Sequence, residues 1–151
     1  MTAKPTRAAV MAWTRLMRSE QAVRGRVEDD LKRAGLPPLA WYGVLLELDT
    51  APEGWLRQSD VQSRTLFTQY NLCRLVDRLE REKLVERRQC TRDGRNNVLV
   101  ITDKGRALRA RMWPAYGSAI QAHVGSRITA PEAEVLAGLL DKLAARPEPG
   151  K

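Results

Sequence analysis

The sequence predicts a mainly α-helical chain that carries one small β-hairpin, with longer helices at both ends. Apolar residues recur at helical spacing over much of the 151 residues. Two strand-like runs flank Asp93-Gly94, and an Asp-Gly pair is a strong signal for a tight turn. Thr129 and Glu132 form a T-x-x-E capping box, which predicts the start of a last helix.

The first helix is expected from Arg7 to about Ala34 and would be about 40 Å long at 1.5 Å per residue. Its apolar stripe consists of Val10, Trp13, Leu16, Met17, Val23, Val27 and Leu31. Gly35 is expected to end the helix. One small domain cannot cover so long a stripe, which indicates a partner chain.

Shorter elements are expected in the middle of the chain. Their ranges are a central apolar helix at 39–48, a very short strand at 55–56, a small helix at 57–64, a second helix at 68–83, and strands at 84–88 and 98–101. The pattern becomes helical again after Thr102. A short helix, a brief turn and a second amphipathic helix form the helix-turn-helix layout.

The helix at 68–83 has one apolar and one polar face. Leu72, Leu75, Val76 and Leu79 share the apolar face, and Thr68 is suited to cap the helix. The opposite face carries Tyr70, Asn71, Arg74, Asp77, Arg78 and Arg81. In a DNA major groove Arg can pair with guanine and Asn with adenine. An ordinary solvated helix is the alternative, but the helix-turn-helix layout favours DNA recognition.

Basic residues crowd the hairpin that follows. Arg87, Arg88, Arg92 and Arg95 lie around its turn with no matching run of acidic residues. A projecting basic loop beside a recognition helix can reach a narrow minor groove, where negative potential is concentrated. An ordinary exposed turn is the alternative, and the preceding helices favour a DNA-contacting wing.

Composition limits the classes of function. The net charge is +8 and the pI is near 10.1, which favours a polyanionic partner. No apolar run is long enough to cross a bilayer, no secretory signal is seen, and two cysteines are too few for a disulfide framework, so we expect a cytoplasmic protein. His123 is the only histidine, and no zinc motif, phosphate-binding glycine loop or nucleophile elbow appears. We therefore expect no enzyme, no metal and no cofactor.

The order of these parts resembles the MarR family of winged helix-turn-helix transcription regulators. The motifs that carry the resemblance are LCRLVDRLEREKLVERR at 72–88 and RDGRNNVLVITDKGRAL at 92–108. The second is similar to the family's wing signature, in which Asp-x-Arg precedes a strand that ends in Thr and is followed by a Gly. The resemblance covers nearly the whole chain.

The resemblance implies a homodimer in which each subunit presents a winged helix to half of a pseudo-palindromic duplex. The domains would be an N-terminal dimerisation helix at 1–36, a winged helix-turn-helix at 37–104, C-terminal dimerisation helices at 105–146, and a disordered tail at 147–151. Residues expected near the major groove or its flanking phosphates are Thr68, Gln69, Tyr70, Asn71 and Arg74, with Arg78 on the same face. Arg95 would enter the minor groove, Asp93 would hold it, and Arg92 would contact a phosphate.

The resemblance also implies a repressor that a small aromatic or phenolic effector releases from DNA. Residues suited to line an effector space are Trp13, Met17, Trp41, Met112 and Tyr116, although core packing would explain each of them equally well. Two other functions remain open. One is an architectural nucleic-acid binder without a defined operator, and the other is a redox-sensing regulator that acts through Cys73 or Cys90.

Overall fold

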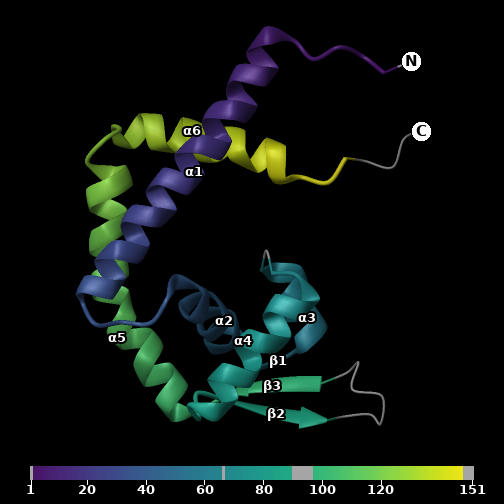
Figure 1. Ribbon diagram of the computed structural model, residues 1–151, viewed down its shortest axis with the longest axis vertical. Helices are drawn as coiled ribbons and strands as arrows, with labels where there is room; N and C mark the ends of the chain where they lie inside the picture. The colour runs from purple at the N-terminus through teal and green to yellow at the C-terminus, as the bar shows by residue number, and fades with distance from the viewer. Residues whose placement is uncertain (1, 66, 90–96, 148–151) are drawn as a thin grey trace. The chain divides into compact units, whose positions relative to one another are not determined.

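The structure is a computed structural model that describes residues 2–65, 67–89 and 97–147. It divides into two compact units (Figure 1). Residues 28–116 form the winged-helix unit. Residues 1–27 and 117–151 form the terminal unit, which joins the two ends of the chain. The division falls inside two long helices, whereas the domain boundaries proposed from the sequence follow the loops near residues 36 and 104.

The winged-helix unit contains the predicted short helices and the predicted hairpin. Its elements are the end of α1 (Arg7–Arg33), α2 (Leu39–Thr50), β1 (Trp55–Arg57), α3 (Gln58–Arg64), α4 (Gln69–Arg81), β2 (Val85–Gln89), β3 (Asn97–Ile101) and the first part of α5 (Asp103–Ile120). Every helix and strand expected from the sequence is present, and the observed bounds differ by only a few residues.

The strands form one antiparallel sheet in the order β1-β3-β2 (Figure 1). Strands β2 and β3 are the predicted hairpin, with Val85 opposite Ile101 and Gln89 opposite Asn97. Strand β1 pairs with the other edge of β3 and places Leu56 opposite Leu99. The sequence pattern did not reveal this second strand pairing, because the partners are more than 40 residues apart.

The core of this unit is entirely apolar. Helix α2 contributes Tyr42, Val44, Leu45 and Leu48, and α4 contributes Leu72, Val76 and Leu79. Leu31, Val61, Leu99 and Met112 are also fully buried. Burying such side chains stabilises a fold by about 1.5–3 kcal/mol each, so the apolar face of α4 is firmly fixed and its other face is left to solvent.

The start of α5 is attached closely to the hairpin. The Thr102 hydroxyl donates to the carbonyl of Lys83 at 2.7 Å and accepts from the Gly105 N–H at 3.0 Å. A Cβ on Gly105 would lie only 2.3 Å from the Leu84 carbonyl oxygen. Only glycine therefore allows α5 to approach the backbone that joins α4 to β2.

Ion pairs attach α5 to α2. Asp49 near the end of α2 accepts a hydrogen bond from Arg106 at 3.0 Å and a shorter one from Arg109. Partial burial would lower the pKa of Arg109, but its hydrogen bonds to Asp49 and Tyr42 outweigh burial and raise it. Arg109 is therefore charged at every physiological pH.

Two helices in this unit end with the same backbone geometry. At the end of α1, Gly35 has φ of 71° and the Leu36 N–H bonds to the Leu31 carbonyl, as expected from the sequence. At the end of α4, the Leu84 N–H bonds to the Leu79 carbonyl, and Lys83 holds the left-handed position with φ of 60°. A side chain is strained in that conformation.

The terminal unit is helical. It contains residues 7–27 of α1, the end of α5, a π-helical turn η1 (Gln121–Gly125) and α6 (Ala130–Ala144). The predicted capping box is present, because Thr129 Oγ1 accepts from the Glu132 N–H and the Glu132 carboxylate accepts from the Thr129 N–H. No helix in the described part of the chain is both long enough and apolar enough to span a membrane.

Candidate nucleic-acid interface

Helix α4 is held so that one complete face is open to solvent. Thr68 caps the helix as predicted, and its side-chain oxygen accepts a hydrogen bond from the Asn71 N–H at 3.2 Å. Leu72, Val76 and Leu79 are fully buried on the inner side. The direction of α4 is thus set by its cap and its core contacts, and its outer side chains are free to contact another molecule.

The residues predicted to contact DNA lie on that outer side. Gln69, Tyr70, Asn71, Arg74 and Arg78 are all exposed, and we call them the α4 face. Tyr70 is 67% exposed, which is unusual for a large aromatic ring and typical of binding surfaces. Arg74 lies beside it, with its guanidinium carbon 5.5 Å from the centre of the Tyr70 ring.

Two acidic residues beside the α4 face are bound by Arg87 at the base of the hairpin, and one of them, Asp77, is neutralised by it. Arg87 on β2 donates to the Asp77 carboxylate at 2.7 Å, and its backbone N–H donates to Glu80 Oε2 at 3.1 Å. Arg88 pairs with Glu86 at 3.2 Å. Although the sequence has no run of acidic residues to match these arginines, Arg87 and Arg88 each have one acidic partner, Asp77 on α4 and Glu86 on the same strand.

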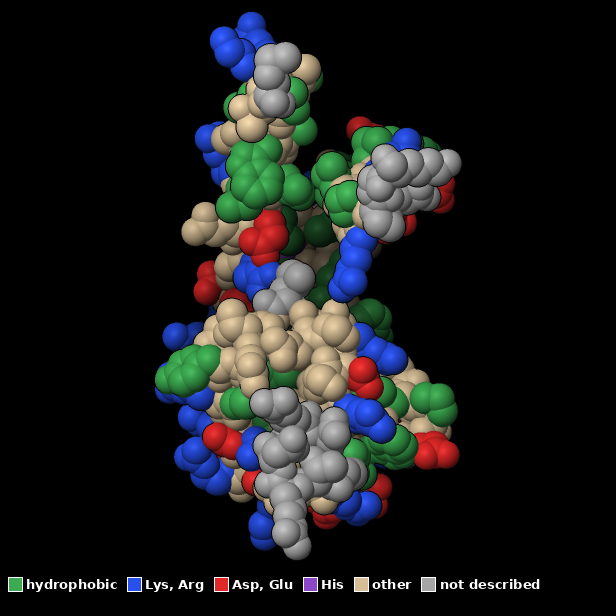
Figure 2. Space-filling view, turned by 90° about the vertical axis from the view of Figure 1, so that its right-hand side faces the viewer, with side chains coloured by type: hydrophobic (Ala, Val, Ile, Leu, Met, Phe, Trp, Pro, Cys, Tyr) green, Lys and Arg blue, Asp and Glu red, His purple; other side chains and the backbone are tan. Residues whose placement is uncertain are grey.

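The ion pair between Asp77 and Arg87 was not predicted from the sequence. Asp77 and Arg87 are ten residues apart, and they meet only because β2 turns back beside α4. This ion pair favours the binding of a polyanion, because a phosphate near α4 would otherwise be repelled by the unpaired carboxylate of Asp77. Figure 2 shows Lys and Arg side chains over much of the winged-helix unit, with fewer Asp and Glu side chains among them.

The predicted tip contacts cannot be placed in the same way. Arg92, Asp93 and Arg95 lie outside the described residues, as does Cys90. The strand pair that leads to them is described as far as Gln89 and Asn97. Cys73 is half-buried, and its Sγ accepts a hydrogen bond from Gln58 Nε2 on α3 at 3.2 Å.

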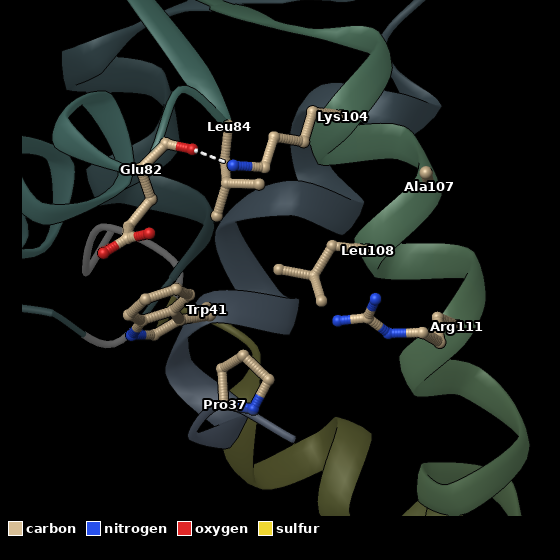
Figure 3. Close-up of a pocket in the computed structure, with 8 residues that line it drawn as sticks. All are labelled: Pro37, Trp41, Glu82, Leu84, Lys104, Ala107, Leu108 and Arg111. Carbon is tan, nitrogen blue, oxygen red and sulfur yellow. Dashed lines mark hydrogen bonds between the residues drawn. The ribbon is translucent and has the colours of Figure 1, made fainter. Parts of the chain in front are cut away.

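A cavity of about 260 Å³ lies between α2, the end of α4 and the start of α5 (Figure 3). Its lining residues are Pro37, Trp41, Glu82, Leu84, Lys104, Ala107, Leu108 and Arg111. Most of the wall is apolar, and the charged groups are Glu82, Lys104 and Arg111. The Lys104 ammonium donates to the Glu82 backbone carbonyl at 3.0 Å, which also caps the end of α4.

The comparisons with known proteins agree with this arrangement of parts. The family model that matches is described as the MarR family, and it matches residues 34–96. Those residues span α2, the helix-turn-helix and the first strand of the hairpin. Residues 34–96 therefore carry the match to the MarR family.

Solved structures of MarR-family regulators resemble the whole chain. Sco5413 of Streptomyces coelicolor is 27% identical, with a TM-score of 0.73 over 91% of this chain and 94% of that chain. Sco3205 of the same organism, solved in complex with DNA, is 23% identical, with a TM-score of 0.83 over 99% and 95%. BpsR of Bordetella bronchiseptica, whose DNA binding is regulated by 6-hydroxynicotinic acid, is 23% identical, with a TM-score of 0.79 over 95% and 100%. No curated protein sequence matches the chain.

The five residues suggested for an effector space are divided between the two units of the chain. Trp13 and Met17 belong to the terminal unit and are 63% and 54% exposed. Met112 is fully buried in the winged-helix core, and Tyr116 packs against Tyr42 with ring centres 4.9 Å apart. Only Trp41 lines the cavity described above.

No group of three or more potential metal ligands occurs within the described ranges 2–65, 67–89 and 97–147. The α4 face instead carries hydrogen-bond donors, acceptors and an aromatic ring, a set suited to recognition of base edges and phosphates.

Proposed function

We propose that this chain is a sequence-specific regulator of transcription that binds double-stranded DNA as a homodimer. The observation that carries the proposal is the α4 face, an exposed row of polar, basic and aromatic side chains on a capped helix. The neighbouring carboxylate Asp77 is already neutralised by Arg87. In this proposal α4 lies in the major groove, and Arg92, Asp93 and Arg95 act at the minor groove.

Apolar surface on the terminal unit supports the dimer. On α1 the exposed apolar residues are Val10, Met11, Trp13 and Met17, and on α6 they are Val135, Leu136, Leu139 and Leu143. Contiguous exposed apolar residues mark association surfaces. A second copy of the chain would cover them and would bring two winged-helix units to successive turns of a palindrome.

An effector site is proposed for the cavity beside Trp41. A planar aromatic acid could pack on Trp41 and Leu108 and place its carboxylate near Lys104 or Arg111. The regulation of BpsR by 6-hydroxynicotinic acid supports a small aromatic effector, and release of the regulator from DNA would make it a repressor. A regulator of this kind acts on DNA in the cytoplasm, without catalysis.

Selection of bound fragments from a genomic library tests the DNA proposal. The homodimer should enrich a pseudo-palindromic sequence and bind it at least about 1,000-fold more tightly than random DNA at the same salt concentration. Binding without such a ratio would identify an architectural protein instead.

The effector proposal needs a separate measurement. Addition of 6-hydroxynicotinic acid or 4-hydroxybenzoic acid should lower the affinity for the selected fragment. Arg111→Met should reduce that response, whereas Arg33→Met should leave it unchanged because Arg33 does not line the cavity. If Arg111→Met responds like the unmodified protein, the effector lies elsewhere.

A further inference from the structure

Two arginines of the α4 face each lie near an aromatic ring, but the rings come from different places. Arg74 lies over Tyr70, which is four residues earlier on the same helix. Arg78 lies over Trp41, with its guanidinium carbon 6.0 Å from the centre of the ring. Trp41 belongs to α2, so the position of Arg78 depends on a second helix of the winged-helix unit.

No acidic residue among those described neutralises the charge of Arg78. Arg87 is bound to Asp77, whereas Arg78 makes no ion pair with any acidic residue in the part of the chain that the structure describes. An aromatic ring attracts a guanidinium group without neutralising its charge. Contact with Trp41 therefore orders the Arg78 side chain while leaving its full charge and its N–H donors available.

Ordering matters because a free arginine side chain carries about 2 kcal/mol of rotamer entropy, part of which is lost when it binds. A side chain that is already held in place loses less on binding. Trp41 is itself half-buried and lines the cavity (Figure 3). A tryptophan side chain has only two side-chain torsions, so it is a more constrained support for a long, exposed side chain than a flexible residue would be.

We propose that Trp41 is a positioning residue that holds Arg78 ready to contact a DNA phosphate. This proposal rests on the proposed function, since it concerns the same DNA-binding surface. Trp41 itself does not contact DNA in this arrangement, and its whole contribution to DNA affinity passes through the Arg78 guanidinium.

A double-mutant cycle tests the proposal on the full-length dimer with the DNA fragment selected above. Trp41→Leu should weaken binding about 2- to 5-fold, the factor that corresponds to a cation–π contact at an exposed site. Arg78→Ala should weaken binding at least as much. The double variant should be no weaker than Arg78→Ala alone, because Trp41 acts only through Arg78.

The salt dependence of binding separates positioning from a general structural effect. Arg78→Ala should reduce the slope of log K against log salt by about 1, the value for one lost phosphate contact. Trp41→Leu should reduce the slope only when Arg78 is present. Trp41→Phe, which keeps an aromatic ring, should restore most of the affinity. Trp55→Leu is the matched control, because Trp55 lies on β1 and, among the residues that the structure describes, no arginine lies over its ring.

The measurements distinguish a failure of the positioning role of Trp41 from a failure of the proposed function. If the effects of Trp41→Leu and Arg78→Ala multiply in the double variant, or if Trp41→Phe is as weak as Trp41→Leu, the positioning role is wrong while the proposed function stands. If Trp41→Leu also lowers the melting temperature, DNA binding is measured instead for Trp41→Phe, alone and combined with Arg78→Ala. The positioning role requires that Trp41→Phe alone keeps most of the affinity and that it adds no loss to that of Arg78→Ala. If the unmodified dimer does not prefer any fragment over random DNA, the proposed function itself fails.

Discussion

Arg74 is the residue of the α4 face that we propose reads a base. It lies near the middle of α4, with its guanidinium carbon 5.5 Å from the centre of the Tyr70 ring. Arg74→Ala should weaken binding to the selected fragment by about 1–3 kcal/mol, because a bidentate contact to guanine contributes that much discrimination. Titration of both the fragment and random DNA measures the change.

The control is Arg33→Ala, which removes the same charge from the end of α1. It should reduce the affinity for both DNAs slightly and equally. If Arg74→Ala also weakens binding to both DNAs equally, Arg74 contacts a phosphate and not a base.

Gly105 decides whether α5 can approach the hairpin. A Cβ there would lie 2.3 Å from the Leu84 carbonyl oxygen and 2.9 Å from the Ile101 side chain. The carbonyl belongs to the backbone and cannot move away cheaply, so Gly105→Ala should destabilise the fold by about 1–3 kcal/mol. Chemical denaturation measures the loss.

Gly43 is the matched control within the same unit, because a Cβ there would meet no atom within 4 Å. Gly43 lies inside α2, where alanine is the better helix former, so Gly43→Ala should stabilise the protein by about 0.5–1 kcal/mol. If Gly43→Ala destabilises the protein as much as Gly105→Ala is expected to, the contact with Leu84 is not the cause of the lost stability.

The end of helix α4 contains a residue with a strained backbone conformation. Lys83 has φ of 60° in the position that glycine normally occupies. Lys83→Gly should stabilise the protein by about 0.5–1 kcal/mol, because the relief of left-handed strain exceeds the added entropy of the unfolded chain. Glu82→Gly, one residue earlier at φ of −81°, should instead destabilise it. The two variants are compared by their melting temperatures.

The first turn of α6 should depend on pH. Hydrogen bonds from the backbone and the side chain of Thr129 lower the pKa of Glu132 below its ordinary value of 4.5. The unfolded chain therefore binds a proton at Glu132 more readily than the folded chain does. The stabilisation by the capping box is complete above pH 4.5 and is lost as the pH falls through the lower, folded pKa.

Hydrogen exchange of the Thr129 amide, which donates to the Glu132 carboxylate at 2.9 Å, measures this loss. After correction for intrinsic exchange, its protection should fall as the pH is lowered from about 6 to about 3. In Glu132→Gln the protection should be independent of pH. A pH dependence that persists in Glu132→Gln would assign the effect to another group.

Local sequence patterns predicted the elements because each is determined by nearby residues. Thr68 caps α4, Gly35 ends α1 and Thr129 opens α6, and all three signals act within a few residues along the chain. Asp77–Arg87, Arg78–Trp41 and the pairing of β1 with β3 were not predicted. They depend on the register between elements, which residue spacing in a single sequence does not specify.

The residue type of Met112 left two roles open, because it suits the lining of an effector space and a packed core equally well. Its side chain is fully buried in the core of the winged-helix unit, and a role toward an effector remains a prediction. The α4 face was predicted correctly since a polar stripe on an amphipathic helix must lie opposite its buried stripe. The positions of Arg92, Asp93 and Arg95 remain predictions.

At the scale of the whole molecule, the terminal unit should join two copies of the chain. Leu139 on α6 is 52% exposed and lies beside Val135 and Leu136 along an apolar groove. Leu139→Glu would place a charge in the proposed dimer interface and should shift the protein toward monomer. Sedimentation equilibrium measures the shift.

Ala137 is exposed on the opposite side of α6, two residues and about 200° from Leu139. Ala137→Glu adds the same charge and should leave the dimer unchanged. A monomer–dimer equilibrium that responds equally to both variants would place the dimer contact elsewhere. Loss of the dimer should also weaken operator binding, because each half-site would then be bound separately.

Thr102 has a consequence for how this regulator can diverge. One side chain and its backbone join the end of α4, the base of the hairpin and the first turn of α5, through bonds to Lys83, Leu84 and Gly105. These bonds close the base of the hairpin, whose strands are described as far as Gln89 and Asn97. Substitutions of exposed side chains at those strand ends therefore leave the bonds of Thr102 intact, so the surface of the hairpin can vary while the attachment of α5 is kept.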